Sequence, residues 1–129
     1  MIPGTLDITL RQGDTYALTL TLSNAIVSFS STTAGTPLDL TGCSAQMGFR
    51  VQPASPLVYK LNSIHATVNG GSLVLGGTAG TIVVHIPPAD SVSMKNGVYD
   101  LRVKFPSGDI YTYVAGSFNV SPQVTPWTT

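Results

Sequence analysis

The sequence predicts an all-β fold, an immunoglobulin-like antiparallel β-sandwich of about seven to nine strands, and three observations support it. Apolar and polar residues alternate with a period of two in several separate runs, which is the pattern of strands with one buried face. Clusters of Gly, Pro, Asn, Asp and Ser divide these runs at short intervals. No window combines a long 3.6-residue period with helix caps.

Strands are expected wherever the alternating runs occur. The first two runs cover residues 6–11 and 16–22, and Gln12-Gly13-Asp14 turns the chain between them. The second of these runs alternates apolar and small or polar residues more strictly than any other part of the chain. The remaining expected strands cover residues 43–51, 57–61, 72–75, 81–86, 99–105 and 110–120.

Two connections between these strands carry specific signals. The glycine-rich residues 76–80 predict a hairpin turn. One helical turn is expected over residues 88–94, because Pro88 and Asp90 suit a first turn, and in a sandwich such a turn typically crosses between the sheets. Tyr99, shortly after Asn96, is interpreted as the corner tyrosine of an immunoglobulin-type fold.

The 129 residues are expected to form one domain, a sandwich over residues 1–122 followed by a C-terminal tail over residues 123–129. The single cysteine, Cys43, excludes an intrachain disulfide and is interpreted as a small core residue. The first residues lack signal-peptide features, and no apolar run reaches the roughly 20 residues of a membrane span. We therefore expect a soluble protein made in the cytoplasm.

Charged residues are scarce in this chain. They form 9% of it, against about 25% in typical soluble domains. Six Lys and Arg residues balance six acidic residues, and the sequence has no basic stripe, so neither nucleic acid nor a membrane surface is expected as a partner. So little charge is typical of a subunit whose faces are covered by neighbouring subunits.

The sequence contains no motif for catalysis or for cofactor binding. His65 and His85 have no Cys or carboxylate at metal-ligand spacing, and the position of His85 within its strand predicts an outward side chain. Neither a phosphate-binding glycine motif nor a GxSxG nucleophile elbow occurs, and the Asp residues fall mostly at turns. We expect no catalytic residues, no metal, no cofactor and no small-molecule substrate; an enzyme would depend on the two histidines alone.

Four residues are the candidate interface residues. Pro126 and Trp127 lie in the tail, and a tryptophan buried at an interface is a frequent hot spot. The alternative is a tail that folds back onto its own sandwich. Ile26 and Phe29 lie in the Ser/Thr-rich residues 23–36, and the alternative for them is a short extra strand pair that packs its own apolar side.

Four segments in order carry a resemblance to a known family, and the likeness covers residues from about 6 to 122. This order resembles the N-terminal immunoglobulin-like domain of phage baseplate upper proteins and of related small virion proteins of tailed bacteriophages. The segments are Arg11-Gln12-Gly13-Asp14; Pro37-Leu38-Asp39-Leu40-Thr41-Gly42 with Ala45-Gln46-Met47-Gly48-Phe49-Arg50; Gly80-Thr81-Ile82-Val83-Val84 with Pro88-Ala89-Asp90; and Gly97-Val98-Tyr99-Asp100-Leu101 with Phe105-Pro106-Ser107-Gly108-Asp109 and Phe118-Asn119-Val120-Ser121-Pro122.

The resemblance implies a non-enzymatic adaptor or accessory subunit of the tail, baseplate or neck, present in multiple copies and connected to fibres or neighbouring phage structural proteins. Residues 23–36 replace what looks like a short hairpin in that family, and no fibre-forming region follows Pro122. Two alternatives stay open. One is a capsid decoration protein; the other is a carbohydrate- or surface-binding β module with an aromatic platform from Tyr59, Tyr111, Tyr113 and Trp127.

Overall fold

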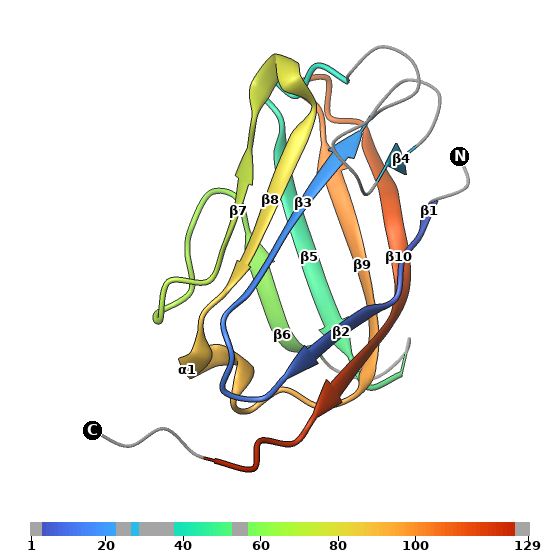
Figure 1. The fold of residues 1–129 in the computed structure, drawn as a ribbon. Helices are drawn as coiled ribbons and strands as arrows, with labels where there is room; N and C mark the ends of the chain where they lie inside the picture. The colour runs from blue at the N-terminus through green and yellow to red at the C-terminus, as the bar shows by residue number, and fades with distance from the viewer. Residues whose placement is uncertain (1–3, 23–26, 29–37, 53–56, 126–129) are drawn as a thin grey trace.

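The computed structural model of the chain describes residues 4–22, 27–28, 38–52 and 57–125. Two β-sheets pack face to face around one hydrophobic core in this part of the chain (Figure 1). The all-β sandwich predicted from the alternating runs is confirmed.

One sheet has six strands. They are β1 (Gly4–Thr5), β2 (Ile8–Arg11), β5 (Ser44–Arg50), β6 (Leu57–Asn62), β9 (Gly97–Lys104) and β10 (Ile110–Ser121). β9 lies between β5 and β10 and is antiparallel to both, and β6 forms the edge beside β5. β1 and β2 follow one another along the far side of β10.

The other sheet has four strands and is antiparallel throughout. They are β3 (Tyr16–Leu22), β4 (Val27–Ser28), β7 (Ser72–Leu75) and β8 (Thr81–Ile86). β8 lies at the centre between β3 and β7, and the two residues of β4 pair with the end of β3. This sheet lies in front of β5, β6 and β9 in Figure 1.

Two features of the sheets differ from the sequence prediction. β1 and β2 pair in parallel with β10, so the sandwich is not antiparallel throughout. The described residues also form ten strands rather than seven to nine, because the expected strand over residues 6–11 is replaced by β1 and β2, and because β4 is an additional two-residue strand. An alternating run fixes which side chains face the core, but it contains no information about strand direction.

The connections agree with the predicted turn signals. The hairpin between β7 and β8 contains a short 3₁₀ helix, η1 (Gly77–Ala79), and Gly80 closes it with a left-handed φ of 71°. The predicted helical turn is α1 (Pro88–Ser91), which begins directly on a proline. α1 carries the chain from β8 in the four-stranded sheet to β9 in the six-stranded sheet, as expected.

The core consists of the inward-facing residues of both sheets. Phe49 lies at its centre, and its ring contacts those of Tyr59, Tyr99 and Phe118 at centroid distances of 5.5, 5.9 and 4.9 Å. Other fully buried members are Ile8, Leu20, Leu22, Met47, Leu61, Ile82, Val84, Ile86, Leu101 and Val103. The expected strand over 43–51 ends one residue early, at Arg50, so that Val51 is 49% exposed instead of inward-facing.

Tyr99 is buried, but it does not act as the predicted corner tyrosine. A corner tyrosine bonds to backbone a few residues upstream, whereas the Tyr99 hydroxyl donates to the carbonyl oxygen of Leu6, 93 positions away. Leu6 also donates its N–H to the Ala115 carbonyl at 3.2 Å. Gly116 lets this segment approach β10, because a Cβ there would lie 2.2 Å from the Leu6 carbonyl oxygen. Tyr99 therefore holds the N-terminal strands against the sheet.

We expect Tyr99→Phe to lower the free energy of unfolding by about 1 kcal/mol, because it removes one hydrogen bond and keeps the buried ring. The loss should appear first as faster amide exchange of Leu6, whose carbonyl loses its partner. Urea unfolding and hydrogen exchange measure the two effects. Unchanged exchange at Leu6 would contradict this role for the hydroxyl.

Candidate functional site

The candidate interface residues predicted from the sequence, Ile26, Phe29, Pro126 and Trp127, lie outside the described residues. The interface role of these four side chains stays a prediction. The described residues present two broad surfaces instead, which are the outer faces of the two sheets.

The outer face of the six-stranded sheet concentrates the basic side chains of the protein. The chain has six Lys and Arg residues in all. Four of them point outward from neighbouring strands of this sheet: Arg50 on β5, Lys60 on β6, and Arg102 and Lys104 on β9. The cause is local, because the inward positions of β9 are taken by apolar residues, which leaves its charged residues on the alternate, outward positions. We call this surface the basic face.

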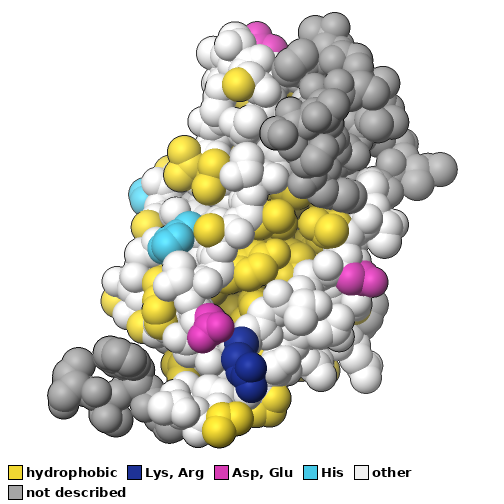
Figure 2. Space-filling model, in the orientation of Figure 1, with side chains coloured by type: hydrophobic (Ala, Val, Ile, Leu, Met, Phe, Trp, Pro, Cys, Tyr) yellow, Lys and Arg dark blue, Asp and Glu magenta, His cyan; other side chains and the backbone are white. Residues whose placement is uncertain are grey.

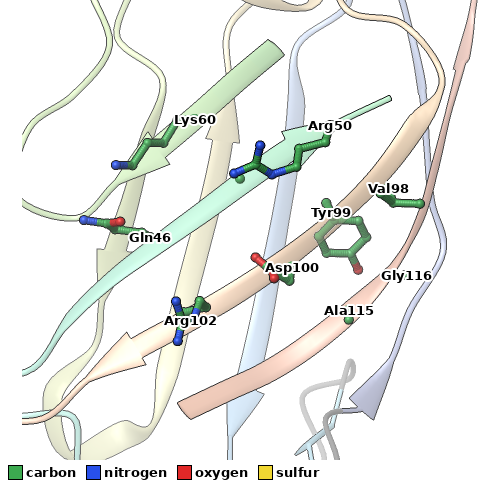
Figure 3. Close-up of a pocket in the computed structure, with 10 residues that line it drawn as sticks. Gln46, Arg50, Lys60, Val98, Tyr99, Asp100, Arg102, Ala115 and Gly116 are labelled. Atoms are coloured by element: carbon green, nitrogen blue, oxygen red, sulfur yellow. The ribbon is translucent and has the colours of Figure 1, made fainter. Parts of the chain in front are cut away.

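A shallow hollow of about 560 Å³ lies on the basic face (Figure 3). Gly48 of β5 lies in this hollow. It is paired across the strands with Lys60 of β6 on one side and with Asp100 of β9 on the other. A glycine has no side chain to fill the space between these neighbours, so the sheet is indented there. In Figure 3 the long side chains of Arg50, Lys60 and Arg102 surround the indentation, and Asp100 lies between the two arginines.

The charge of the protein is distributed asymmetrically around this face. The basic face carries four basic side chains and one acidic side chain, Asp100, which gives a formal charge of +3. The rest of the chain has two basic and five acidic residues, which gives −3 and balances the total to zero. A net charge of zero therefore conceals one surface with an excess of basic side chains.

The outer face of the four-stranded sheet carries no Asp, Lys or Arg among its described residues. Cross-strand rows on it join Ala17, His85 and Ser72 in one line, and Thr19, Val83 and Val74 in the next. Figure 2 views the molecule from this side and shows white and yellow side chains over the sheet together with cyan His side chains, while the dark blue ones gather at one spot below it. We call this surface the uncharged face.

Asp90 of α1 is a buried carboxylate that accepts several side-chain hydrogen bonds. It accepts hydrogen bonds from the Tyr59 hydroxyl, from the Thr67 hydroxyl at 2.7 Å and from the Asn69 amide at 2.8 Å. Burial raises the pKa of Asp90, but the hydrogen bonds from Tyr59, Asn69 and Thr67 outweigh burial and hold that pKa below its usual value. These bonds join α1 to β6 and to the 63–71 loop, so Asp90 stabilises the fold. Asp90 therefore bonds to side chains of other elements rather than to the backbone of its own turn.

The side chains that could act in catalysis or in metal binding do not lie together among the described residues. His85 points outward, as predicted, and His65 is exposed. Cys43 packs against the core, where burial and then the nearby Asp39 carboxylate raise the pKa of its thiol and disfavour the reactive thiolate. Among the residues that the structure describes, no three His, Cys or Asp side chains converge as metal ligands. None of the helices in the described ranges has the length and apolar character required to cross a membrane.

The aromatic platform required by the carbohydrate-binding alternative is not assembled by the described residues. Tyr59 is turned toward Phe49 and Asp90, and Tyr113 is only 6% exposed. Tyr111 is 42% exposed, but it stands edge-on to Phe105 and Tyr113. Of the three described tyrosines only Tyr111 is exposed, and the fourth platform residue, Trp127, lies outside the described residues.

Part of the basic face could be predicted from the alternation of apolar and polar residues in the sequence. Arg50, Arg102 and Lys104 all occupy the polar positions of alternating runs, so an outward direction could be predicted for each of them. Their grouping on one face could not, because Arg50 and Arg102 are 52 positions apart and come to the same face only through the pairing of β5 with β9. The same pairing places Gly48 beside Asp100.

No protein-family model matches this sequence, and no curated protein matches it either. Among solved structures, a T-cell receptor of the chicken is similar, with a TM-score of 0.53 and 13% sequence identity. The match covers 97% of this chain and 56% of the receptor chain, so the chain spans little more than half of that receptor chain. At this identity the likeness shows the fold alone, which is the predicted immunoglobulin-like β-sandwich.

Proposed function

We propose that this chain is a non-enzymatic structural subunit of a tailed-bacteriophage particle, an adaptor of the tail, baseplate or neck that docks on neighbouring proteins through its sheet faces. Four sequence segments that occur in the same order as in phage baseplate upper proteins support the assignment to a phage particle. The immunoglobulin-like sandwich is compatible with it, and the asymmetric surfaces favour docking over catalysis. The proposed location is the assembled virion, after synthesis in the host cytoplasm.

The observation that carries this proposal is the uncharged face. Its outward rows contain small residues such as Ala17, Thr19 and Ser72, and Val74 is 56% exposed on it. A free monomer usually has charges of both signs distributed over its surface, because they maintain solubility. A face without charge loses little solvation when another protein covers it, since few ions have to be desolvated.

The test is the composition and architecture of purified particles. We expect mass spectrometry of particles from the phage that encodes this chain to detect it in multiple copies. Electron microscopy of particles with an epitope-tagged chain should place the label on the tail, baseplate or neck. A label on the head would support the capsid-decoration alternative, and complete absence from particles would contradict the proposal.

We expect deletion of residues 122–129 to leave the fold intact and to reduce incorporation of the chain into particles. β10 ends at Ser121, and the next residues bury little, because Val124 is 82% exposed and Gln123 and Thr125 line an open hollow beside α1. Circular dichroism and thermal unfolding check the fold, and immunoblotting of purified particles checks incorporation. Loss of folding would show that the tail is part of the core.

A further inference from the structure

We propose that the basic face binds an extended acidic segment of a partner protein, one that carries carboxylates at alternate positions. The inference rests on the proposed function, because it names the chemistry of one neighbour in the assembly. It depends on three observations: the spacing of the cations along β9, their arrangement around the hollow, and the single carboxylate among them.

The spacing along β9 matches that of an extended peptide. Arg102 and Lys104 are exposed and two residues apart, so their Cα atoms are separated by about 6.7 Å along the strand. Alternate side chains of any extended segment repeat at the same interval. Carboxylates at alternate positions can therefore meet Arg102 and Lys104 in turn, and the guanidinium group of Arg102 can bind one of them through two parallel hydrogen bonds.

The hollow provides the second row of cations. Lys60 lies across Gly48 from β9, about two strand spacings or roughly 10 Å away. Gly48 has no side chain, so the bottom of the hollow lies close to the backbone of β5. A peptide can therefore lie in the hollow between Lys60 and Arg102, with its carboxylates within reach of either side chain. Among the residues that the structure describes, Lys60, Arg102 and Lys104 form no hydrogen bond or ion pair with other side chains, so a peptide need break no contact among these residues to reach them.

The negative charge of Asp100 favours a protein partner over a nucleic acid. A nucleic acid presents a phosphate at every nucleotide and gains affinity by neutralising many of them. On the basic face a strand of phosphates would also meet Asp100, which is exposed and lies between the cations. A protein segment avoids this repulsion, since it can place a neutral or basic side chain opposite Asp100.

The test measures binding of a labelled peptide by fluorescence anisotropy at low ionic strength. The probe has eight residues, the length of β9, with glutamate alternating with threonine. A peptide of the same composition with its glutamates in one block tests the spacing, and a single-stranded oligonucleotide of equal charge tests the class of partner. The variants are Lys60→Glu and Arg102→Glu, with Lys95→Glu as the matched control for a charge reversal away from the basic face.

We expect saturable binding of the alternating peptide, weakened roughly tenfold by Lys60→Glu or Arg102→Glu and changed less than about twofold by Lys95→Glu. Asp100→Asn should strengthen binding of the peptide, and added salt should weaken it. If Lys60→Glu or Arg102→Glu fails to fold, the neutral variants Lys60→Gln and Arg102→Gln test the same side chains and should also weaken binding of the peptide.

Absence of saturable binding, equal loss in Lys95→Glu, equal affinity for the block peptide, or tighter binding of the oligonucleotide would each overturn the inference. The proposed function fails by a different observation, which is absence of the chain from purified particles. Particles that contain the chain while the peptide does not bind would overturn only the partner chemistry.

Discussion

We expect Phe49→Ala to lower the free energy of unfolding by about 3–5 kcal/mol, because it leaves a cavity at the centre of the core. The Phe49 side chain is fully buried, and its ring contacts those of Tyr59, Tyr99 and Phe118. These rings come from β6, β9 and β10, so the substitution loosens three strands of the six-stranded sheet together. The remaining side chains are held by their own strands and can collapse into the cavity only in part.

The measurement for Phe49→Ala is urea unfolding followed by fluorescence and circular dichroism. Val68→Ala is the control, because Val68 is fully exposed in a turn and its truncation should change the free energy of unfolding by less than about 0.5 kcal/mol. If Phe49→Ala cost no more than Val68→Ala, Phe49 would not lie at the centre of a packed core.

The second large effect is expected for Asp90→Ala, which should lower the free energy of unfolding by about 3 kcal/mol. The substitution leaves the Tyr59, Thr67 and Asn69 donors without their shared acceptor. Thr67 also accepts a bond from the Gly71 N–H at 2.7 Å, so the 63–71 loop should lose its attachment to α1. Asp109→Ala is the control, since Asp109 is an exposed carboxylate in the β9–β10 hairpin.

The contribution of Asp90 should also depend on pH with a definite sign. Its pKa is lower in the folded chain than in the unfolded chain, so the ionised carboxylate stabilises the fold above the unfolded pKa, which is about 3.9. The stabilisation is lost as the pH falls through the lower folded value. We expect the difference in free energy of unfolding between the original chain and Asp90→Asn to shrink from pH 7 to pH 3; a constant difference would contradict a charged Asp90.

The local features of this fold could be predicted from the sequence because they depend on neighbouring residues. β7 and β8 have the predicted bounds, since a glycine-rich turn separates two short apolar runs. α1 begins at the predicted proline and crosses between the sheets. Cys43, with its small apolar character, packs against the core as expected.

The features that could not be predicted depend on residues far apart in the chain. β1 and β2 pair in parallel with β10, more than 100 positions away, and the alternation of Ile8 and Leu10 is the same for either direction. Tyr99 could be expected to bond to backbone, but not to Leu6. The three donors to Asp90 come from β6 and the following loop, and nothing in the residues around Asp90 indicates them.

The same distinction applies to the candidate site. The scarcity of charge was visible in the composition, and it supports a covered subunit. The collection of four of the six basic residues on one face required the pairing of β5 with β6 and β9. The interface residues favoured by the sequence, Trp127 foremost, lie outside the described residues, so the basic face is a second, independent candidate for contact with a partner.

A reconstruction by electron cryomicroscopy of the particle in which we propose that this chain resides tests the central claim most directly. We predict repeated copies of a two-sheet sandwich on the tail, baseplate or neck, with Lys60, Arg102 and Lys104 against carboxylates of an adjoining protein. A particle without this chain would contradict the proposed function, and one in which the basic face of every copy is open to solvent would contradict the proposed partner of that face.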